Sequence, residues 1–295
     1  MNVLITGGGG LLGFYLNRVI SYSHNILTFY RSKPGNCLNY NSFRIDITDY
    51  DRLYALVRDF KPDVIIHCAA ISSPKKTEGL SSKEVFNINV NATKLLAEIS
   101  SSINAKIIYT SSDLVYAGYR GSMIKEDGKL IPVSLYAETK LMGEEKIKEY
   151  AGNYLILRTA LLYGFGFEGT FNHFDLLFNN LKNKKNVRLF HDQFRTPLAL
   201  PDAARIILKL INLNTGNEII NLGGCERISR LKFGEKLCKA AGLDSSLIEK
   251  ISMYDIPGIT QVEDVSMNTD KLQSFGIRQN SIDESINEIL NENNR

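Results

Sequence analysis

Residues 3–13 of the chain read VLITGGGGLLG, an apolar run that leads directly into a run of glycines. Apolar residues at helical spacing follow, so the glycines stand between an expected strand and an expected helix. Gly7, Gly10 and Gly13 are spaced three and three, which suits a tight turn, a backbone that can approach a pyrophosphate, and close helix–strand contact. A P-loop would need Lys and then Ser or Thr after the last glycine, but Phe14 stands there. This stretch therefore predicts a dinucleotide-binding turn.

Strands and helices alternate through the first half of the chain. Apolar, β-branched runs at residues 26–30, 64–68 and 106–109 are expected to be strands, and amphipathic patterns at residues 49–60 and 81–99 to be helices. Because the runs are apolar throughout instead of alternating, both faces of the sheet should be covered. The pattern predicts an α/β fold built on a doubly wound parallel sheet.

Beyond Gly164 the alternation weakens, and a helix–strand unit at residues 201–222 is expected to return to the sheet. The chain should therefore contain a dinucleotide-binding domain and a smaller, interwoven C-terminal α/β domain that binds substrate. The expected division assigns residues 1–165 and about 199–223 to the first domain, and about 166–198 and 224–295 to the second.

The composition excludes several functional classes. Thirty-five Lys and Arg against 32 Asp and Glu leave a net charge of +3, too small for binding nucleic acid through bulk charge. No apolar stretch reaches the ~20 residues of a membrane span, and no secretory signal is visible at the amino terminus. The four cysteines stand far apart without a CxxC pair, which argues against disulfides and a zinc site. We therefore expect a reduced, cytoplasmic protein with no metal and with neither nucleic acid nor membrane as a partner.

The end of the second expected strand carries no acid, although many dinucleotide-binding folds place one there for the adenosine ribose. It reads Tyr30-Arg31-Ser32-Lys33. Two cations at this position favour a ribose 2′-phosphate, which an arginine can bind bidentately. We therefore expect Arg31 to bind the cofactor, and NADPH to be preferred over NADH.

Tyr136 and Lys140 are four residues apart, so they share one face of an expected helix. A free tyrosine has a pKa near ~10 and is a poor catalyst at neutral pH, but a nearby positive charge lowers that pKa. Upstream, the strand at residues 106–109 leads into the polar segment Ser111-Ser112-Asp113. A tyrosine and a lysine four residues apart are common on exposed helices. The polar segment and the glycine turn are what make a functional role for Tyr136 and Lys140 a reasonable hypothesis.

Together these motifs resemble the extended short-chain dehydrogenase/reductase family, within the NAD-dependent epimerase/dehydratase superfamily. The nearest likeness is to dTDP-4-dehydrorhamnose reductases, through Ser111–Tyr116, Tyr136–Glu144 and His191–Phe194. The resemblance implies a Rossmann-like fold and NADPH-dependent reduction of the 4-keto group of a nucleotide-activated 4-keto-6-deoxy sugar. The matching segments occur in the family's order and are Thr6–Gly13, Asp46-Ile47, Cys68–Ala70, Asn89–Thr93, Ser111–Tyr116, Tyr136–Lys140 and Leu157–Gly164.

The resemblance also implies roles for individual residues. Ser112 would hold the substrate carbonyl, Tyr136 would protonate its oxygen, and Lys140 would bind the nicotinamide ribose and keep the tyrosine pKa low. Substrate contacts are implied for Ser112 and Asp113, and for Arg195 at the sugar-nucleotide pyrophosphate. The implied cofactor contacts are Gly7, Gly10, Leu11, Leu12, Gly13, Arg31, Asp46, Ile47, Ala69, Ala70, Tyr136 and Lys140.

Several departures from the family pattern leave alternatives open. Leu114 stands where the dehydratases carry a catalytic Glu, so dehydration is not expected, whereas a nucleotide-sugar 4-epimerase remains an alternative. Leu161 replaces the Trp that the rhamnose reductases usually have, and Arg195 begins a segment where they have Gly-x-Pro-Thr. The Arg-containing version resembles the regulatory β subunit of methionine adenosyltransferase, so a nucleotide-binding regulatory subunit with little turnover is a second hypothesis. The nucleotide base, the sugar stereochemistry and the oligomeric state, a homodimer included, stay open.

Two further residues have a structural and a functional interpretation. His67 lies in an apolar expected strand and is interpreted as a core imidazole whose hydrogen bonds are satisfied, not as a ligand. Asn89 matches a position of the family, but a buried helical asparagine can equally be a structural bridge.

Overall fold

The computed structural model describes residues 1–119, 121–167 and 170–293, and the chain folds as two compact units. The first unit comprises Met1–Val115, Pro132–Arg158 and Ala204–Ile220, and the second comprises Tyr116–Ile131, Thr159–Ala203 and Asn221–Arg295. The division differs from the expected one at residues 159–165, 199–203, 221–223 and 116–131, which all belong to the second unit; the longest of these segments is 116–131.

Long-range contacts place this segment in the second unit. Ile124 forms a β-bridge with Met267, and the side-chain amide of Asn221 donates to the carbonyl oxygen of Ile124 at 2.9 Å. The hydroxyl of Tyr116 in turn donates to Oδ1 of Asn221 at 2.7 Å.

The first unit is built around a seven-stranded parallel sheet with the order β11-β6-β5-β4-β1-β2-β3. From β1 the chain moves outward through β2 to β3 and then crosses to β4 on the other side of β1. The strand order therefore reverses between β1 and β4, which is where parallel α/β sheets form a ligand-binding crevice. The strands are β1 (Asn2–Thr6), β2 (Asn25–Tyr30), β3 (Asn41–Arg44), β4 (Val64–His67), β5 (Lys106–Ser112), β6 (Tyr154–Thr159) and β11 (Glu218–Leu222).

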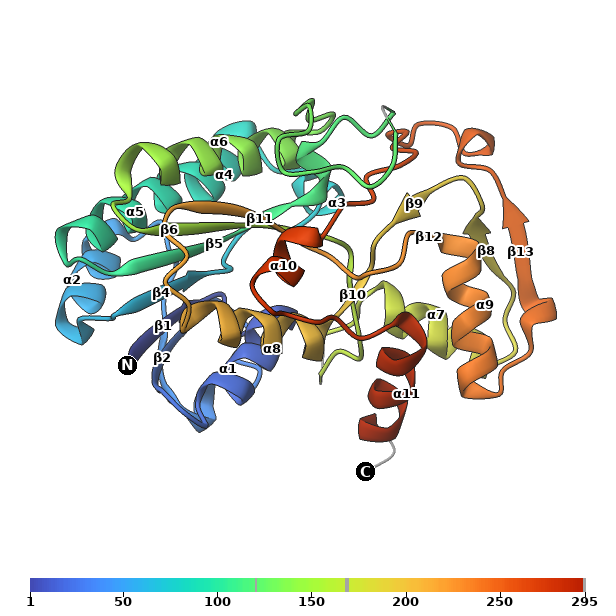
Figure 1. Cartoon of the computed structure of the whole chain (residues 1–295), viewed down its shortest axis with the longest axis horizontal. Coiled ribbons are helices and arrows are strands. Elements are labelled where there is room, and N and C mark those ends of the chain that lie inside the picture. The colour runs from blue at the N-terminus through green and yellow to red at the C-terminus, as the bar shows by residue number, and fades with distance from the viewer. Residues whose placement is uncertain (120, 168–169, 294–295) are drawn as a thin grey trace. The chain divides into compact units, whose positions relative to one another are not determined.

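Helices flank this sheet, with α1 on the face opposite to α5 and α6 (Figure 1). The predicted α/β Rossmann-like class is confirmed. The buried strand residues Leu4, Ile65 and Ile107 pack in one cluster with Leu96 of α5, which explains why the strands are apolar throughout. The helices and short turns are α1 (Leu11–Ile20), η1 (Cys37–Asn39), α2 (Tyr50–Phe60), α3 (Pro74–Thr77), α4 (Ser82–Phe86), the π-helical turn η2 (Asn87–Asn91), α5 (Ala92–Ser102), η3 (Asp113–Val115), α6 (Leu135–Tyr150) and α8 (Leu200–Ile211).

In its described part, the second unit contains small two-stranded sheets and an aromatic core. β8 pairs with β13, β7 with β10, and β9 antiparallel with β12. The rings of Tyr163 and Phe233 meet edge to face at 4.9 Å, and Phe174 packs beside them. The elements are β7 (Leu162–Tyr163), α7 (His173–Lys182), β8 (Val187–Phe190), β9 (Phe194–Arg195), β10 (Leu198–Ala199), β12 (Ile228–Ser229), α9 (Arg230–Ala241), η4 (Ser245–Leu247), β13 (Ile248–Ile251), η5 (Met253–Asp255), α10 (Asp270–Ser274) and α11 (Ile282–Asn293).

None of the helices among the described residues has the length and apolar character that crossing a membrane requires.

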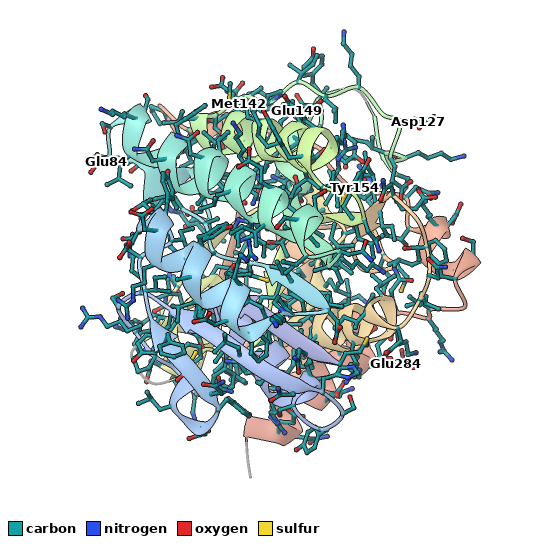
Figure 2. The ribbon with its side chains drawn as sticks, turned by 90° about the vertical axis from the view of Figure 1, so that its left-hand side faces the viewer. Glu84, Asp127, Met142, Glu149, Tyr154 and Glu284 are labelled. Carbon is teal, nitrogen blue, oxygen red and sulfur yellow. The ribbon has the colours of Figure 1, made fainter. Side chains whose placement is uncertain are left out.

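A buried ion pair fastens α6 to the sheet of the first unit. The carboxylate of Glu144 accepts from Nη2 of Arg158 on β6 at 2.8 Å and from the hydroxyl of Ser111 on β5 at 2.5 Å. Both charged side chains are buried, while the outward side of α6 carries exposed residues such as Met142 and Glu149 (Figure 2). The pair thus holds the inward face of α6 against two strands.

We expect Arg158→Met to lower the free energy of unfolding by about 3–5 kcal/mol, because it leaves the Glu144 carboxylate buried without its counter-charge. The double variant Glu144→Gln/Arg158→Met removes both charges and should recover a large part of the loss. Urea unfolding of the two variants and the wild type measures both effects. Equal stability of the single variant and the wild type would contradict this account.

Candidate active site

The glycine turn between β1 and α1 is packed so closely that side chains are excluded. A Cβ at Gly7 would lie 2.8 Å from the backbone nitrogen of Ala69, and its φ of +72° also favours glycine. A Cβ at Gly13 would lie 2.3 Å from the carbonyl oxygen of Gly7. α1 begins after Gly10, which has no side chain to cap the helix. The first N–H groups of α1 can therefore bind an anion such as a pyrophosphate.

Basic side chains adjoin this turn. A Cβ at Gly9 would lie 2.0 Å from the carbonyl oxygen of Lys33, so the segment after β2 runs directly beside the glycines. Arg31 is exposed there, and Nε of Arg44, at the end of β3, donates to the carbonyl oxygen of Arg31 at 3.1 Å. Arg44 was not predicted, because its place beside Arg31 depends on the pairing of β3 with β2. The two guanidinium groups of Arg31 and Arg44 are suited to binding a ribose 2′-phosphate.

The remaining predicted cofactor residues follow β1, β3 and β4 of the first unit. Asp46 follows β3 and is exposed, and its carboxylate accepts from the backbone N–H and the hydroxyl of Thr48 at 3.0 and 2.7 Å. Ile47 is buried. Partly buried positions are held by Leu11 and Leu12 at the start of α1 and by Ala69 and Ala70 after β4.

Ser112, Tyr136 and Lys140 are all buried in the first unit, with exposed fractions of 5%, 8% and 3%. Ser112 ends β5, Tyr136 lies in the first turn of α6, and Lys140 lies one turn later. The Ser112 hydroxyl is close enough to Tyr136 to lower the pKa of the phenol. The ammonium group of Lys140 lies 4.1 Å from the centroid of the Tyr109 ring. The structure therefore buries all three side chains in one unit, with Tyr136 and Lys140 one turn apart on α6.

Burial shifts both titratable groups of this trio. It raises the pKa of Tyr136 to about 12, with the Ser112 hydroxyl opposing and the charge of Asp113 adding to the shift. Burial likewise lowers the pKa of Lys140 to about 7, against the attraction of Cys68 and Glu144. The expectation that Lys140 keeps the tyrosine pKa low is not met without a cofactor, because burial dominates the pKa of Tyr136 and Lys140 is not among the groups that shift it.

The predicted substrate residues are divided between the units. Asp113 is buried next to Ser112, whose hydroxyl donates to Oδ1 of Asp113 at 3.3 Å. Arg195 belongs to the second unit and is only 6% exposed. Its Nη1 donates to the carbonyl oxygens of Phe194 and Val262 at 2.8 and 3.5 Å. This guanidinium therefore supports the backbone around β9.

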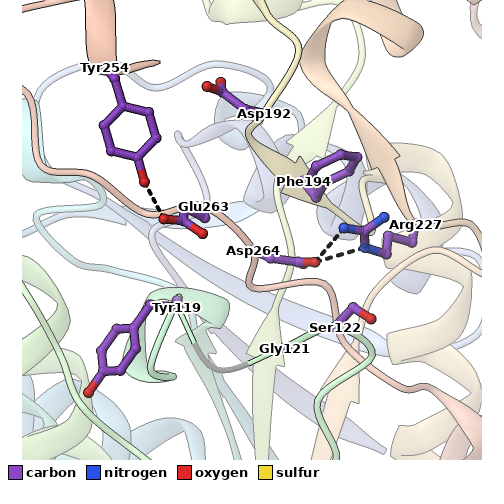
Figure 3. Close-up of a pocket in the computed structure, with 10 residues that line it drawn as sticks. Tyr119, Gly121, Ser122, Asp192, Phe194, Arg227, Tyr254, Glu263 and Asp264 are labelled. Carbon is purple, nitrogen blue, oxygen red and sulfur yellow. Dashed lines mark hydrogen bonds and ion pairs between the residues drawn. The ribbon is translucent and has the colours of Figure 1, made fainter. Parts of the chain in front are cut away.

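The second unit contains a pocket of about 410 Å³ (Figure 3). Its wall carries Arg227, whose Nε and Nη2 bind the carboxylate of Asp264 at 2.8 and 2.7 Å. The guanidinium lies 3.7 Å from the centroid of the Phe194 ring, and Tyr254 donates a hydrogen bond to Glu263 nearby. The sequence offered no signal for Arg227 and Asp264, because 37 residues separate them.

The chain is similar to known proteins in both sequence and fold. The family model for the RmlD substrate binding domain matches residues 1–295. The chain is 30% identical over 286 residues to methionine adenosyltransferase 2 subunit beta of Xenopus laevis, covering 94% of this chain and 83% of that protein. It superposes on a dTDP-4-dehydrorhamnose reductase structure from Clostridium acetobutylicum with a TM-score of 0.87 and 25% identity, over 100% of both chains. A Bacillus anthracis dTDP-4-dehydrorhamnose reductase in complex with NADP shares the fold, with a TM-score of 0.86, 24% identity and 99% coverage of both chains.

We expect Lys140→Met to raise thermal stability, because the folded protein holds this lysine at a pKa of about 7 instead of its ordinary 10.5. Between these two values the unfolded chain binds the extra proton, so burial of the amine destabilises the wild type most at pH 7 and below. The gain should therefore be largest at pH 6–7 and shrink as the pH rises toward 10. Melting temperatures of the wild type and the variant at pH 6 and 9.5 measure it. A gain that grew with pH would contradict the assignment.

Proposed function

The chain belongs to the RmlD substrate-binding domain family, as its motifs suggested, and we propose that it is an NADPH-dependent nucleotide-sugar reductase. Its substrate would be a nucleotide-activated 4-keto-6-deoxy sugar, reduced at the 4-keto group. The observation that carries this proposal is the burial of Ser112, Tyr136 and Lys140 together, in the same unit as the glycine turn. A site that only bound a nucleotide would need the turn and its cations, but not this trio.

The glycine turn fits a dinucleotide. The space beside Gly7 and Gly13 is closed to side chains, the first turn of α1 offers free N–H groups, and Arg31 and Arg44 add positive charge. These groups would hold the pyrophosphate and the 2′-phosphate of NADPH. When bound, NADPH supplies the hydride.

The chain's own residues would bind the substrate carbonyl and supply the proton that its oxygen takes up. The hydroxyl of Ser112 holds the substrate carbonyl, and the phenol of Tyr136 donates a proton to its oxygen as negative charge develops there. Tyr136 carries its proton at neutral pH, but its raised pKa makes it a weak acid until a positive charge stabilises the phenolate. Lys140 can regain its charge when the anionic cofactor lies close by, which then favours the phenolate that remains after proton transfer.

The pocket of the second unit is a candidate site for part of the sugar nucleotide. Arg227 has five N–H donors, of which Asp264 takes two. The aromatic rings of Phe194 and Tyr254 offer flat apolar surface. Arg195, proposed for the pyrophosphate, lies on the strand that also carries Phe194.

Preference for NADPH can be tested at Arg31. Arg31→Ala should weaken NADPH binding by about tenfold or more, because a charge-assisted hydrogen bond contributes about 1.5–3 kcal/mol, while NADH binding stays unchanged. Fluorescence titration of both cofactors measures the two affinities. Arg52→Ala, which removes an exposed arginine of α2, is the matched control. Equal loss for NADPH and NADH would contradict a 2′-phosphate contact.

The relation to methionine adenosyltransferase 2 subunit beta supports a second candidate function, that of a nucleotide-binding regulatory subunit. A turnover assay distinguishes the reductase from the regulatory subunit. The purified protein is offered 4-keto-6-deoxy sugars on dTDP, GDP, CDP and UDP, and oxidation of NADPH is followed. The reductase proposal expects turnover with at least one sugar. A regulator would show none while binding a partner synthetase.

Tyr136→Phe should lower kcat by about 10²- to 10⁴-fold, since it removes the proton donor and leaves the ring in place. Cofactor affinity should change little. The matched control is Tyr163→Phe, which removes a phenol hydroxyl from the core of the second unit. Steady-state rates with the best sugar measure the effect. Unchanged turnover in Tyr136→Phe would exclude this tyrosine as the acid.

A further inference from the structure

A buried histidine connects the end of β1 to α5. His67 ends β4, is 1% exposed, and pairs in register with Thr6, the residue that precedes the glycine turn. Its Nδ1 lies 2.7 Å from Oγ1 of Thr6, and its Nε2 lies 2.9 Å from Oγ1 of Thr93. Both ring nitrogens are therefore hydrogen-bonded, as expected of a core imidazole. Through Thr93 and Thr6, however, further hydrogen bonds extend to Tyr136 and to the segment after β4.

On one side the hydrogen bonds continue to the tyrosine of the site. The hydroxyl of Thr93 donates to the carbonyl oxygen of Asn89 at 2.8 Å, and Nδ2 of Asn89 donates to Oγ1 of Thr139 at 3.0 Å. The hydroxyl of Thr139 then donates to the carbonyl oxygen of Tyr136 at 2.9 Å. Asn89, Thr93 and Thr139 are all buried, and Asn89 lies in the π-helical turn η2.

On the side of Thr6, the hydrogen bonds continue to Ala69, one of the predicted cofactor residues after β4. The backbone N–H of Ala69 donates to Oγ1 of Thr6 at 3.3 Å. Ala69 is also the residue that would meet a Cβ at Gly7. The hydrogen bonds of His67 therefore reach the two pieces of backbone that form the glycine turn and its neighbour.

The number of protons available determines which group donates in each of these hydrogen bonds. Each threonine hydroxyl has one proton, and Thr93 uses its proton for the carbonyl of Asn89. Thr93 must then accept from Nε2–H of His67, which leaves Nδ1 of the neutral ring to accept from Thr6. Every donor from Ala69 to Tyr136 consequently points the same way, and from Ala69 to the backbone carbonyl of Asn89 each hydrogen bond polarises the next.

The surroundings keep this imidazole neutral. Burial, followed by the charge of Lys140, lowers the pKa of His67 to about 3. The ring packs against Tyr109, with centroids 5.7 Å apart, and Cys68 follows it in the chain. Protonation would place a second charge near Lys140 and remove the acceptor that Thr6 uses.

We propose that His67, held as the neutral Nε2–H tautomer, is a positioning residue that keeps the glycine turn and Tyr136 in fixed relation. It acts through Thr6 and Ala69 on the cofactor side, and through Thr93, Asn89 and Thr139 on the side of the acid. Asn89 is then a structural bridge in this chain of bonds. The inference rests on the proposed function, in which the turn binds NADPH and Tyr136 donates the proton.

The tautomer can be observed directly in the wild-type protein. Nitrogen-15 NMR of the histidine-labelled chain, with His67→Gln used to assign the signal, reports which ring nitrogen carries the proton. We expect the Nε2–H form, without titration between pH 5.5 and 8.5. The opposite tautomer, or protonation within this range, would overturn the proposal.

Two variants test the positioning role. His67→Leu removes both hydrogen bonds, whereas His67→Gln keeps one donor and one acceptor. We expect His67→Leu to weaken NADPH binding about tenfold and to lower kcat about ten- to a hundredfold, because small displacements of reacting groups reduce rates that strongly. His67→Gln should restore a substantial part of both.

A control variant distinguishes a loss of positioning from a general loss of stability. Lys106→Met disrupts another buried polar group of the same unit, whose ammonium donates to the carbonyl oxygens of Leu210 and Leu213 at 3.1 and 2.9 Å. It should lower the melting temperature without changing NADPH affinity or kcat. If His67→Leu behaves the same way, the positioning role is wrong. A wild type that binds NADPH but reduces no sugar would refute the proposed function, while the tautomer and the affinities still decide this inference.

Discussion

The close backbone contact among Gly7, Gly13 and Ala69 is the constraint around which the first unit is arranged. It brings the start of α1 against the turn after β1 and leaves no room for a Cβ at either glycine. Because β1 and β4 are neighbours in register, this contact lies where the strand order reverses. A helix end with free N–H groups therefore lies beside the carboxyl ends of both strands. The basic segment after β2 follows from the same packing.

Helix α6 shows how the unit combines stability with reactivity. Its buried face carries Tyr136, Lys140 and Glu144, spaced four residues apart, where a helix that served packing alone would carry apolar side chains. Glu144 is compensated by Arg158 and Ser111, so its burial holds the helix to the sheet. Within the part of the chain that the structure describes, Lys140 has no such ion pair, and burial lowers the pKa of its amine. The helix thus uses one buried charge for attachment and leaves the other available for chemistry.

The sequence predicts those features that depend on local patterns. Glycine spacing located the turn, continuous apolar runs located the strands, and the four-residue spacing placed Tyr136 and Lys140 on one face. Features that depend on register or on distant contacts were missed. Arg44 reaches Arg31 only through the pairing of β2 with β3, and Arg227 meets Asp264 across 37 residues. The pKa of Tyr136 without a cofactor could not be predicted from the spacing either, since it depends on burial by the whole unit and not on the neighbouring lysine.

The electrostatics of the site also bear on the choice between a reductase and a regulatory subunit. A buried lysine with a pKa near neutrality destabilises the free protein, and a buried phenol beside a serine hydroxyl adds polar groups that must be satisfied. Neither group is needed to hold a pyrophosphate, which the turn, the end of α1 and the arginines can do. Both become useful when negative charge develops on a carbonyl oxygen, because the phenol then has a proton to give and the ammonium stabilises the phenolate. The arrangement therefore matches proton transfer better than it matches binding alone.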